Sequence, residues 1–210
     1  GAIGVNAGVN VSSAAATDGT IQLKASGDIT NNASGVLTGD TSGKLLAYST
    51  GGKIDLSAVA SAMKTASFQT GTTTTVSGTD GIVKYYDSTD LTLAKVGGVG
   101  TLVSPSTANH ASTVALSGQG VKTVAGGTDG AVTIRAGTTG TSTLTVDEAI
   151  LTTPGTGTGG SVILEAGGAI TLTSGNAGTI TTSGGTTGSG GEVFVHAKTG
   201  LIDLSQAIKA

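Results

Sequence analysis

The 210-residue chain has no cysteine and no tryptophan, and only 2% of its residues are aromatic. Without cysteine there is neither a disulfide framework nor a thiolate metal site. The fold must therefore be held together by packing and backbone pairing. No apolar run approaches the roughly 18 residues of a membrane-spanning helix, and no stretch has the pattern of a signal peptide. We therefore expect no membrane span and no metal or other cofactor.

Charge is also scarce, since charged residues make up 11% of the chain and the net charge is −3. The ten basic residues are scattered along the chain, so we do not expect the protein to bind nucleic acid. Glycine, threonine and serine together supply 96 of the 210 residues, a composition that is common in flexible linkers. Disorder is nevertheless disfavoured, because 37% of the residues are hydrophobic and many of them alternate with polar ones, which is a strand signal.

The alternation recurs as a seven-residue motif, Gly-x-φ-x-φ-x-Ala, in which φ is aliphatic. A second short alternation, such as Ile170–Leu172, follows most copies. The separations between successive motif glycines are 18, 24, 38, 49, 30 and 31 residues. Clear copies begin at Gly1, Gly19, Gly130, Gly160 and Gly191, and looser copies begin at Gly43 and Gly81.

Strands this short cannot bury their apolar face alone, but stacked copies can share a continuous core. The repeat therefore predicts an all-β parallel β-helix, or β-solenoid, of about eight coils with three short strands each. The long intervals predict insertions near 57–80, where "SAVASAMKTASF" suits a short helix or a loop, and near 94–129, where an irregular coil is expected. The phase of the motif points these residues inward: Ile3, Val5, Ile21, Leu23, Leu45, Val83, Val132, Ile134, Val162, Leu164, Val193 and Val195.

An antiparallel sandwich or barrel is the alternative fold. Asp-Gly pairs precede three copies of the motif, at Asp18, Asp80 and Asp129, and such pairs suit hairpin turns. Recurrence of one motif favours the stacking of equivalent strands instead.

Two stretches, "GGSVILEAGGAITLTSGNAGTITTSGG" and "GGEVFVHAKTGLIDLSQAIKA", resemble the repeats of filamentous-haemagglutinin-like exoproteins. The resemblance is clearest from Gly130 to Ala210. It implies a right-handed parallel β-helix in a large secreted bacterial adhesin, located outside the cell or on its surface. It also implies a rod used for adhesion or as a stalk, without an active site. The Asn-Pro motifs of that family's secretion domain are absent, which indicates repeat region rather than secretion module.

Few residues are candidates for a binding site. Sugars stack on aromatic rings, so we consider Tyr48, Tyr86, Phe68 and Phe194 as weak candidates for ligand binding. The motif phase places Tyr48, Tyr86 and Phe194 outward and Tyr85 inward, and Phe68 joins them if the segment 57–80 folds over that face. The alternative is a purely structural role, in which this segment only covers the aromatic patch.

The polar candidates can also be explained by structural or surface roles. The aspartates of the three Asp-Gly pairs lack the spacing of calcium-binding repeats and are typical of turns. Arg135 and Glu165 share a register and predict an exposed ion pair between neighbouring coils. The only histidines, His110 and His196, are expected at the surface. We therefore expect no metal site and no catalytic residues.

The expected function is non-catalytic: one β-solenoid segment, residues 1–210, of a longer secreted or cell-surface protein that serves adhesion, matrix or filament formation. Its expected partners are further coils or copies of itself, stacked end to end with "LIDLSQAIKA" meeting "GAIGVNAG", and host or matrix glycans. A glycan-binding or polysaccharide-cleaving β-helix is the alternative. An ice-binding solenoid would need regular threonine ladders, and Thr171–Thr173 is not matched by Ile202–Leu204.

Overall fold

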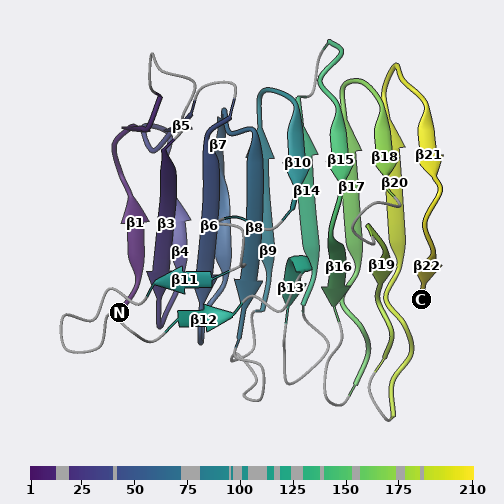
Figure 1. Cartoon of the computed structure of the whole chain (residues 1–210). Coiled ribbons are helices and arrows are strands. Elements are labelled where there is room, and N and C mark those ends of the chain that lie inside the picture. Colours follow the sequence, from purple (N-terminus) through teal and green to yellow (C-terminus); the bar gives the residue numbers. More distant parts are fainter. Residues whose placement is uncertain are drawn as a thin grey trace.

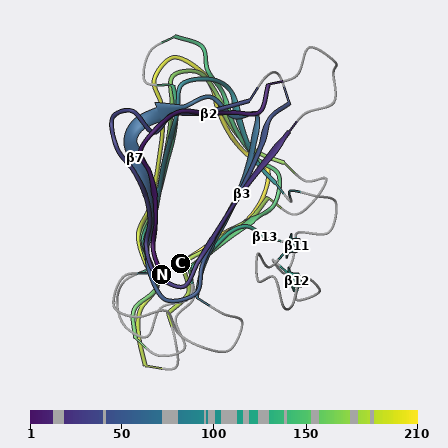
Figure 2. The same cartoon turned by 90° about the vertical axis from the view of Figure 1, so that its left-hand side faces the viewer.

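The computed structural model shows a parallel β-solenoid, with each turn of the chain stacked on the one before (Figure 1). It describes residues 1–12, 19–39, 42–71, 81–94, 96, 101–103, 113–115, 119–123, 130–137, 140–152, 157–173, 178–184 and 187–210. All the regular structure in these residues is β-strand. Seen along the rod, the turns superpose around one interior (Figure 2). The predicted fold class is confirmed.

One side of the rod is a seven-stranded parallel sheet, here called the first sheet. We number the coils 1 to 7 by its strands. In order along the rod these are β1 (Ile3–Val5), β4 (Ile29–Asn31), β7 (Ile54–Ser61), β9 (Val83–Asp87), β14 (Val132–Ala136), β17 (Val162–Ala166) and β20 (Val193–Ala197).

The opposite side is an eleven-stranded sheet that divides partway along the rod, here called the forked sheet. Its undivided part is made by β3 (Thr20–Ala25), β6 (Lys44–Ser49) and β8 (Thr65–Thr70). One arm continues from β8 through β10 (Leu91–Leu93), β15 (Leu144–Val146), β18 (Ile170–Leu172) and β21 (Ile202–Leu204). The other arm continues through β13 (Gln119–Thr123), β16 (Ala149–Thr152), β19 (Ile180–Thr181) and β22 (Ile208–Lys209).

The fork arises because β8 pairs with two strands of the next coil. Its first residues pair with β10, through Thr65 and Ala66, whereas its last residues, from Phe68 to Thr70, pair with β13. Coils 1 and 2 also contain the narrow sheet of β2 (Val9–Asn10) and β5 (Leu37–Thr38). Because the forked sheet divides after β8, the rod changes its cross-section between coils 3 and 4.

Between β10 and β13 the chain leaves the coil and makes an antiparallel hairpin of β11 (Thr101–Val103) and β12 (Thr113–Ala115). Both views place this hairpin outside the coil, on the side of the forked sheet (Figures 1 and 2). The expected insertion near 94–129 therefore contains a hairpin, and β13 completes coil 4 rather than adding an irregular coil.

The core is built from aliphatic stacks that run the length of the rod. One stack follows the register of the first sheet through Ile3, Ile29, Ile54, Val83, Val132, Val162 and Val193. Of the twelve residues expected to point inward, eight are buried, and the other four are partly buried against the same core. Those four, Ile3, Leu23, Val193 and Val195, all lie in the end coils, where one side of each strand is open.

The expected number of coils, about eight, is too high. The motifs at Gly19 and Gly43 do not begin new coils, because their strands, β3 and β6, are the last strands of coils 1 and 2. From Gly81 onward the motif strands, beginning with β9, lie in the first sheet. The motif specifies which side chains of a strand face the core, and this alternation is the same on either side of the rod.

The segment 57–80 was expected to be a helix or loop insertion, and this is wrong for the residues that the structure describes. Residues 54–61 form β7 and residues 65–70 form β8, so they are ordinary coil. The irregularity is a bulge between Leu56 and Ser61. Asn31 holds the bulge from the coil below, since its side chain donates to the Val59 carbonyl (3.3 Å) and accepts from the Ala58 N–H (3.1 Å).

Replacing Leu164 by Asp should unfold at least the coils next to β17. Leu164 is fully buried between Ile134 and Val195, and a carboxylate there has no partner. We expect a loss of about 4 kcal/mol or more in the free energy of unfolding, measured by denaturant titration. The matched control is Ile163→Asp, one residue away on the outer side, with an expected loss of about 1 kcal/mol at most. Equal stabilities of the two variants would show that the assigned phase is wrong.

Candidate functional site

The outer side of the first sheet carries an ordered row of chemically distinct side chains over coils 4 to 7. Tyr86, Arg135, Glu165 and His196 lie in register on four successive strands. They point away from the core because the residues that precede them, such as Ile134 and Leu164, are buried inside. We call these four residues the outer row.

The members of the outer row contact one another. The Arg135 guanidinium lies over the Tyr86 ring, with its central carbon 4.6 Å from the ring centroid. The same guanidinium pairs with Glu165, donating through Nε to Oε2. The Arg135 and Glu165 side chains are 35% and 27% exposed. The predicted ion pair is therefore confirmed, and solvent screening keeps its contribution to stability below about 1 kcal/mol.

An aromatic ring stands beside the end of the outer row. Phe194, in β20, is 54% exposed, and its ring centroid lies 6.1 Å from that of His196. At the other end, Tyr86 lies where the bulge of β7 leaves the sheet, since its neighbours Tyr85 and Asp87 pair with Leu56 and Ser61. The row thus runs from a bulge to an exposed ring.

The structure separates the four aromatic residues considered for ligand binding. Tyr86 and Phe194 lie on the outer side of the first sheet, as their phase predicts. Tyr48 also points away from the core, but it lies on the forked sheet and is buried with Leu46 and Val96.

Phe68 does not join this aromatic surface, so that expectation is wrong. It is part of β8 and pairs with Ala47, which puts it in the inward phase of the sheet. Its ring lies in the core with its centroid 5.0 Å from that of Tyr85. Tyr85 is inward, as predicted.

The remaining candidates stay apart. His196 is exposed as expected, whereas His110, Asp18, Asp80 and Asp129 lie outside the described residues. In the described part of the chain, no group of three or more His, Asp or Glu side chains is placed to hold a metal ion.

A buried carboxylate in coil 4 escaped the sequence analysis. Asp87 occupies the position where coils 5 to 7 have alanine, and its side chain lies in the interior. One oxygen, Oδ2, accepts from the Tyr85 hydroxyl (2.6 Å) and the Met63 N–H (2.9 Å). The other, Oδ1, accepts from the Thr89 N–H (2.9 Å) and hydroxyl (2.7 Å). The signal was the motif "GIVKYYD", which ends in Asp instead of Ala.

Burial sets the ionisation of this group. Desolvation raises the pKa of Asp87, although its hydrogen bonds from Tyr85, Met63 and Thr89 act in the opposite direction. Burial also raises the pKa of Tyr85 well above its usual value, and the neighbouring carboxylate adds to the increase. Tyr85 therefore keeps its proton, and its hydroxyl donates a hydrogen bond to Asp87. We interpret the cluster as a polar connection between coils 3 and 4, where the rod changes its cross-section.

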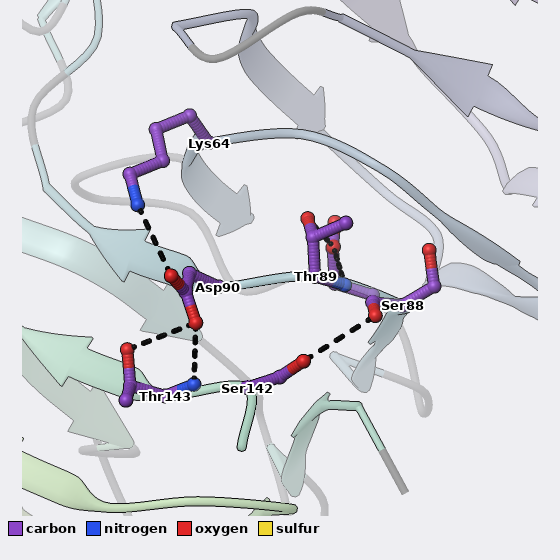
Figure 3. Close-up of polar contacts among 7 residues, drawn as sticks. Lys64, Ser88, Thr89, Asp90, Ser142 and Thr143 are labelled. Atoms are coloured by element: carbon purple, nitrogen blue, oxygen red, sulfur yellow. Dashed lines mark hydrogen bonds and ion pairs between the residues drawn. The ribbon is translucent and has the colours of Figure 1, made fainter. Parts of the chain in front are cut away.

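A second acidic residue, Asp90, lies at an exposed corner next to β10 (Figure 3). Its Oδ1 accepts from the Thr143 N–H (2.7 Å) and hydroxyl (3.2 Å) of coil 5. Its Oδ2 lies 3.7 Å from Lys64 Nζ of coil 3. The hydrogen bond from the Thr143 backbone is the main cause of the lowered pKa of Asp90. One carboxylate thus links three coils, which is a structural role.

In comparisons with known proteins, no family model, curated protein or solved structure matches this chain. No helix long and apolar enough to cross a membrane occurs in the described residues.

The two aspartates should give opposite contributions to the pH dependence of stability. The raised pKa of Asp87 means that the folded state holds this proton more tightly than the unfolded state. Asp87 therefore contributes a fall in stability as the pH rises from the usual aspartate pKa to the raised one. Asp90, with a lowered pKa, contributes stability that is lost as the pH falls through its folded value.

Denaturant titrations from acid to neutral pH test this assignment with the Asp87→Asn and Asp90→Asn variants. The Asp87→Asn variant should lose the falling component, and its stability should rise more with pH than that of the parent. The Asp90→Asn variant should show the reverse change. At every pH, Asp87→Asn also costs about 1–3 kcal/mol, because its amide leaves the N–H of Met63 or Thr89 without an acceptor. Parallel pH profiles for the parent and both variants would contradict the assignment.

Proposed function

We propose that this chain is a non-catalytic structural segment of a large secreted or cell-surface bacterial protein, serving adhesion, matrix or filament formation. The observation that supports the proposal is the continuity of strand register through all seven strands of the first sheet. Each inward side chain packs on the equivalent side chain of the neighbouring coil. The same few aliphatic residue types can therefore build the core along the whole rod.

The connections between coils suit a load-bearing part. Backbone hydrogen bonds tie each coil to the next along both sheets, and they run parallel to the rod axis. The seven strands of the first sheet are separated by six spacings of about 4.8 Å, so they span roughly 29 Å along the rod. A force along the rod would therefore be shared by many backbone hydrogen bonds at each level, which is what a stalk or spacer requires.

A second candidate function, glycan binding, is favoured by the outer row. Sugar rings present C–H groups that stack on aromatic faces, and hydroxyl groups that bond to charged side chains. Phe194 offers an exposed ring, and Arg135 and Glu165 offer a donor and an acceptor on the same flat surface. The charges of this pair cancel, which suits a neutral polysaccharide better than a strongly acidic one.

Assays with immobilised protein and soluble neutral polysaccharides distinguish these functions. We expect no release of new reducing ends during incubation, because the proposed role includes no chemistry. Release of new reducing ends that follows the folded protein through purification would refute the non-catalytic proposal.

If the outer row binds glycan, the double variant Tyr86→Ala/Phe194→Ala should retain polysaccharide about tenfold less well, at roughly 0.5–1.5 kcal/mol for each ring. The matched control is Thr133→Ala, which removes a ringless side chain from the same surface and should leave retention unchanged. Equal retention by the double variant and the control would exclude this face as the glycan site and leave the structural role in place.

A further inference from the structure

We propose that the surface around Arg135 and Glu165 recognises the N-acetyl groups of a neutral polysaccharide, so that its ligand is a chain of N-acetylated amino sugars. This inference rests on the glycan-binding function proposed above, and it names the sugar substituent that the site selects. The third residue that carries it is Ile163. All three lie on the neighbouring strands β14 and β17, on the side of the rod (Figure 1).

The Arg135 guanidinium is held in place but keeps hydrogen-bond donors for a ligand. It lies over the Tyr86 ring, with its central carbon 4.6 Å from the ring centroid, and its Nε donates to Glu165. Neither contact uses the two terminal amino groups, which have no acceptor among the described residues. A guanidinium fixed on both sides loses little freedom when it binds, so it is suited to hold a carbonyl oxygen.

Glu165 places an acceptor beside these donors. Its Oε2 accepts from Arg135, whereas its Oε1 has no donor in the part of the chain that the structure describes. The two residues are in register on adjacent strands, so donors and acceptor stand about 4.8 Å apart at their backbones. A ligand group that contains both a carbonyl and an N–H can bind to both residues.

Ile163 adds an apolar contact to the same patch. It lies two residues before Glu165 on β17, about 7 Å away along the strand. Both residues point outward, because Leu164 between them is buried in the core. Ile163 itself is half-buried, so part of its side chain is open to a ligand.

A donor, an acceptor and an apolar side chain on one small patch match the three parts of an acetamido group. The carbonyl oxygen of that group accepts from Arg135, its N–H donates to Glu165, and its methyl group packs on Ile163. A sugar hydroxyl can satisfy only the two polar residues. Ile163 is therefore the residue that distinguishes an N-acetylated sugar from an unsubstituted one.

The charges on this side of the sheet also favour an uncharged substituent. Arg135 is paired with Glu165, and Lys84 is in register with Asp55 on the strand next to it. A sugar that has lost its acetyl group carries an ammonium ion, which would lie beside the guanidinium and would offer it no acceptor. The site should therefore reject the de-N-acetylated form of the polysaccharide that it binds.

The length of the outer row sets the size of a suitable probe. The row crosses four strands, which are separated by three spacings of about 4.8 Å, or roughly 14 Å. A β-1,4-linked sugar chain is extended, and a tetramer is long enough to cover this distance. Three tetramers that differ only in one substituent are therefore matched probes: those of N-acetylglucosamine, glucose and glucosamine.

Calorimetric titration of the complete chain with these three tetramers tests the proposal. The N-acetylglucosamine tetramer should bind about tenfold more tightly than the glucose tetramer, because it adds one hydrogen bond to a charged group and one methyl contact. The glucosamine tetramer should bind most weakly. Saturation-transfer NMR should give its strongest signals on the acetyl methyl protons, as contact with Ile163 requires.

Two single variants identify the site. Ile163→Thr removes the apolar contact and Arg135→Gln removes the charged donors, so each should lose most of the preference for the N-acetylated tetramer. Both residues lie on the outer side of the sheet, where such changes should leave the fold intact. The matched control is Thr145→Ala, on the outer side of β15 in the forked sheet, and it should keep the full preference.

The outcomes separate this inference from the function on which it rests. Equal affinity for the N-acetylglucosamine and glucose tetramers would overturn the N-acetyl assignment while glycan binding stands. A preference that survives both variants would also overturn it, since the selective contacts would then lie elsewhere. If no tetramer binds and longer neutral polysaccharides are not retained either, the glycan-binding function fails together with the assignment.

Discussion

The pairing of each strand with the same strand of the next coil is the constraint on which the rest of this structure depends. It satisfies the backbone groups of strands that are only two to eight residues long, and it brings equivalent side chains into contact along the rod. Aliphatic residues at these positions bury one another regardless of the coil in which they lie. This is why a chain with few aromatic residues and no disulfide can build a long continuous core from valine, isoleucine and leucine.

The same constraint explains the irregular parts. A coil can vary in length only where its strands do not pair with those of the next coil, so inserted residues project from the side of the rod. The bulge of β7 lies in coil 3, and the hairpin of β11 and β12, which is inserted in the chain of coil 4, lies outside the coil (Figures 1 and 2). The buried carboxylate of Asp87 lies at the change of cross-section between coils 3 and 4, and it accepts hydrogen bonds from Tyr85 of its own strand and from Met63 of coil 3. Such hydrogen bonds are directional, so they connect the two coils in one specific position where aliphatic packing alone would tolerate several.

The surface follows from the pairing as well. Side chains on the outer side of a parallel sheet stand about 4.8 Å from their equivalents, which brings Tyr86, Arg135 and Glu165 into contact although they are far apart in the sequence. We therefore regard the outer row as the surface that displays chemically distinct side chains to the side of the rod.

The sequence by itself determined the local properties: the all-β parallel class, the inward phase of residues such as Leu164 and Val132, the outward phase of Tyr86 and Phe194, and the pairing of Arg135 with Glu165. All of these depend on the two-residue period of a strand and on the spacing of one repeat. The tertiary structure decided which side of the rod each motif occupies, and with it the number of coils. It also decided that Phe68 enters the core, that Tyr48 is covered, and that Asp87 is buried within a set of donors. These outcomes depend on which distant strands become neighbours, and an alternating pattern is the same on every side of the rod.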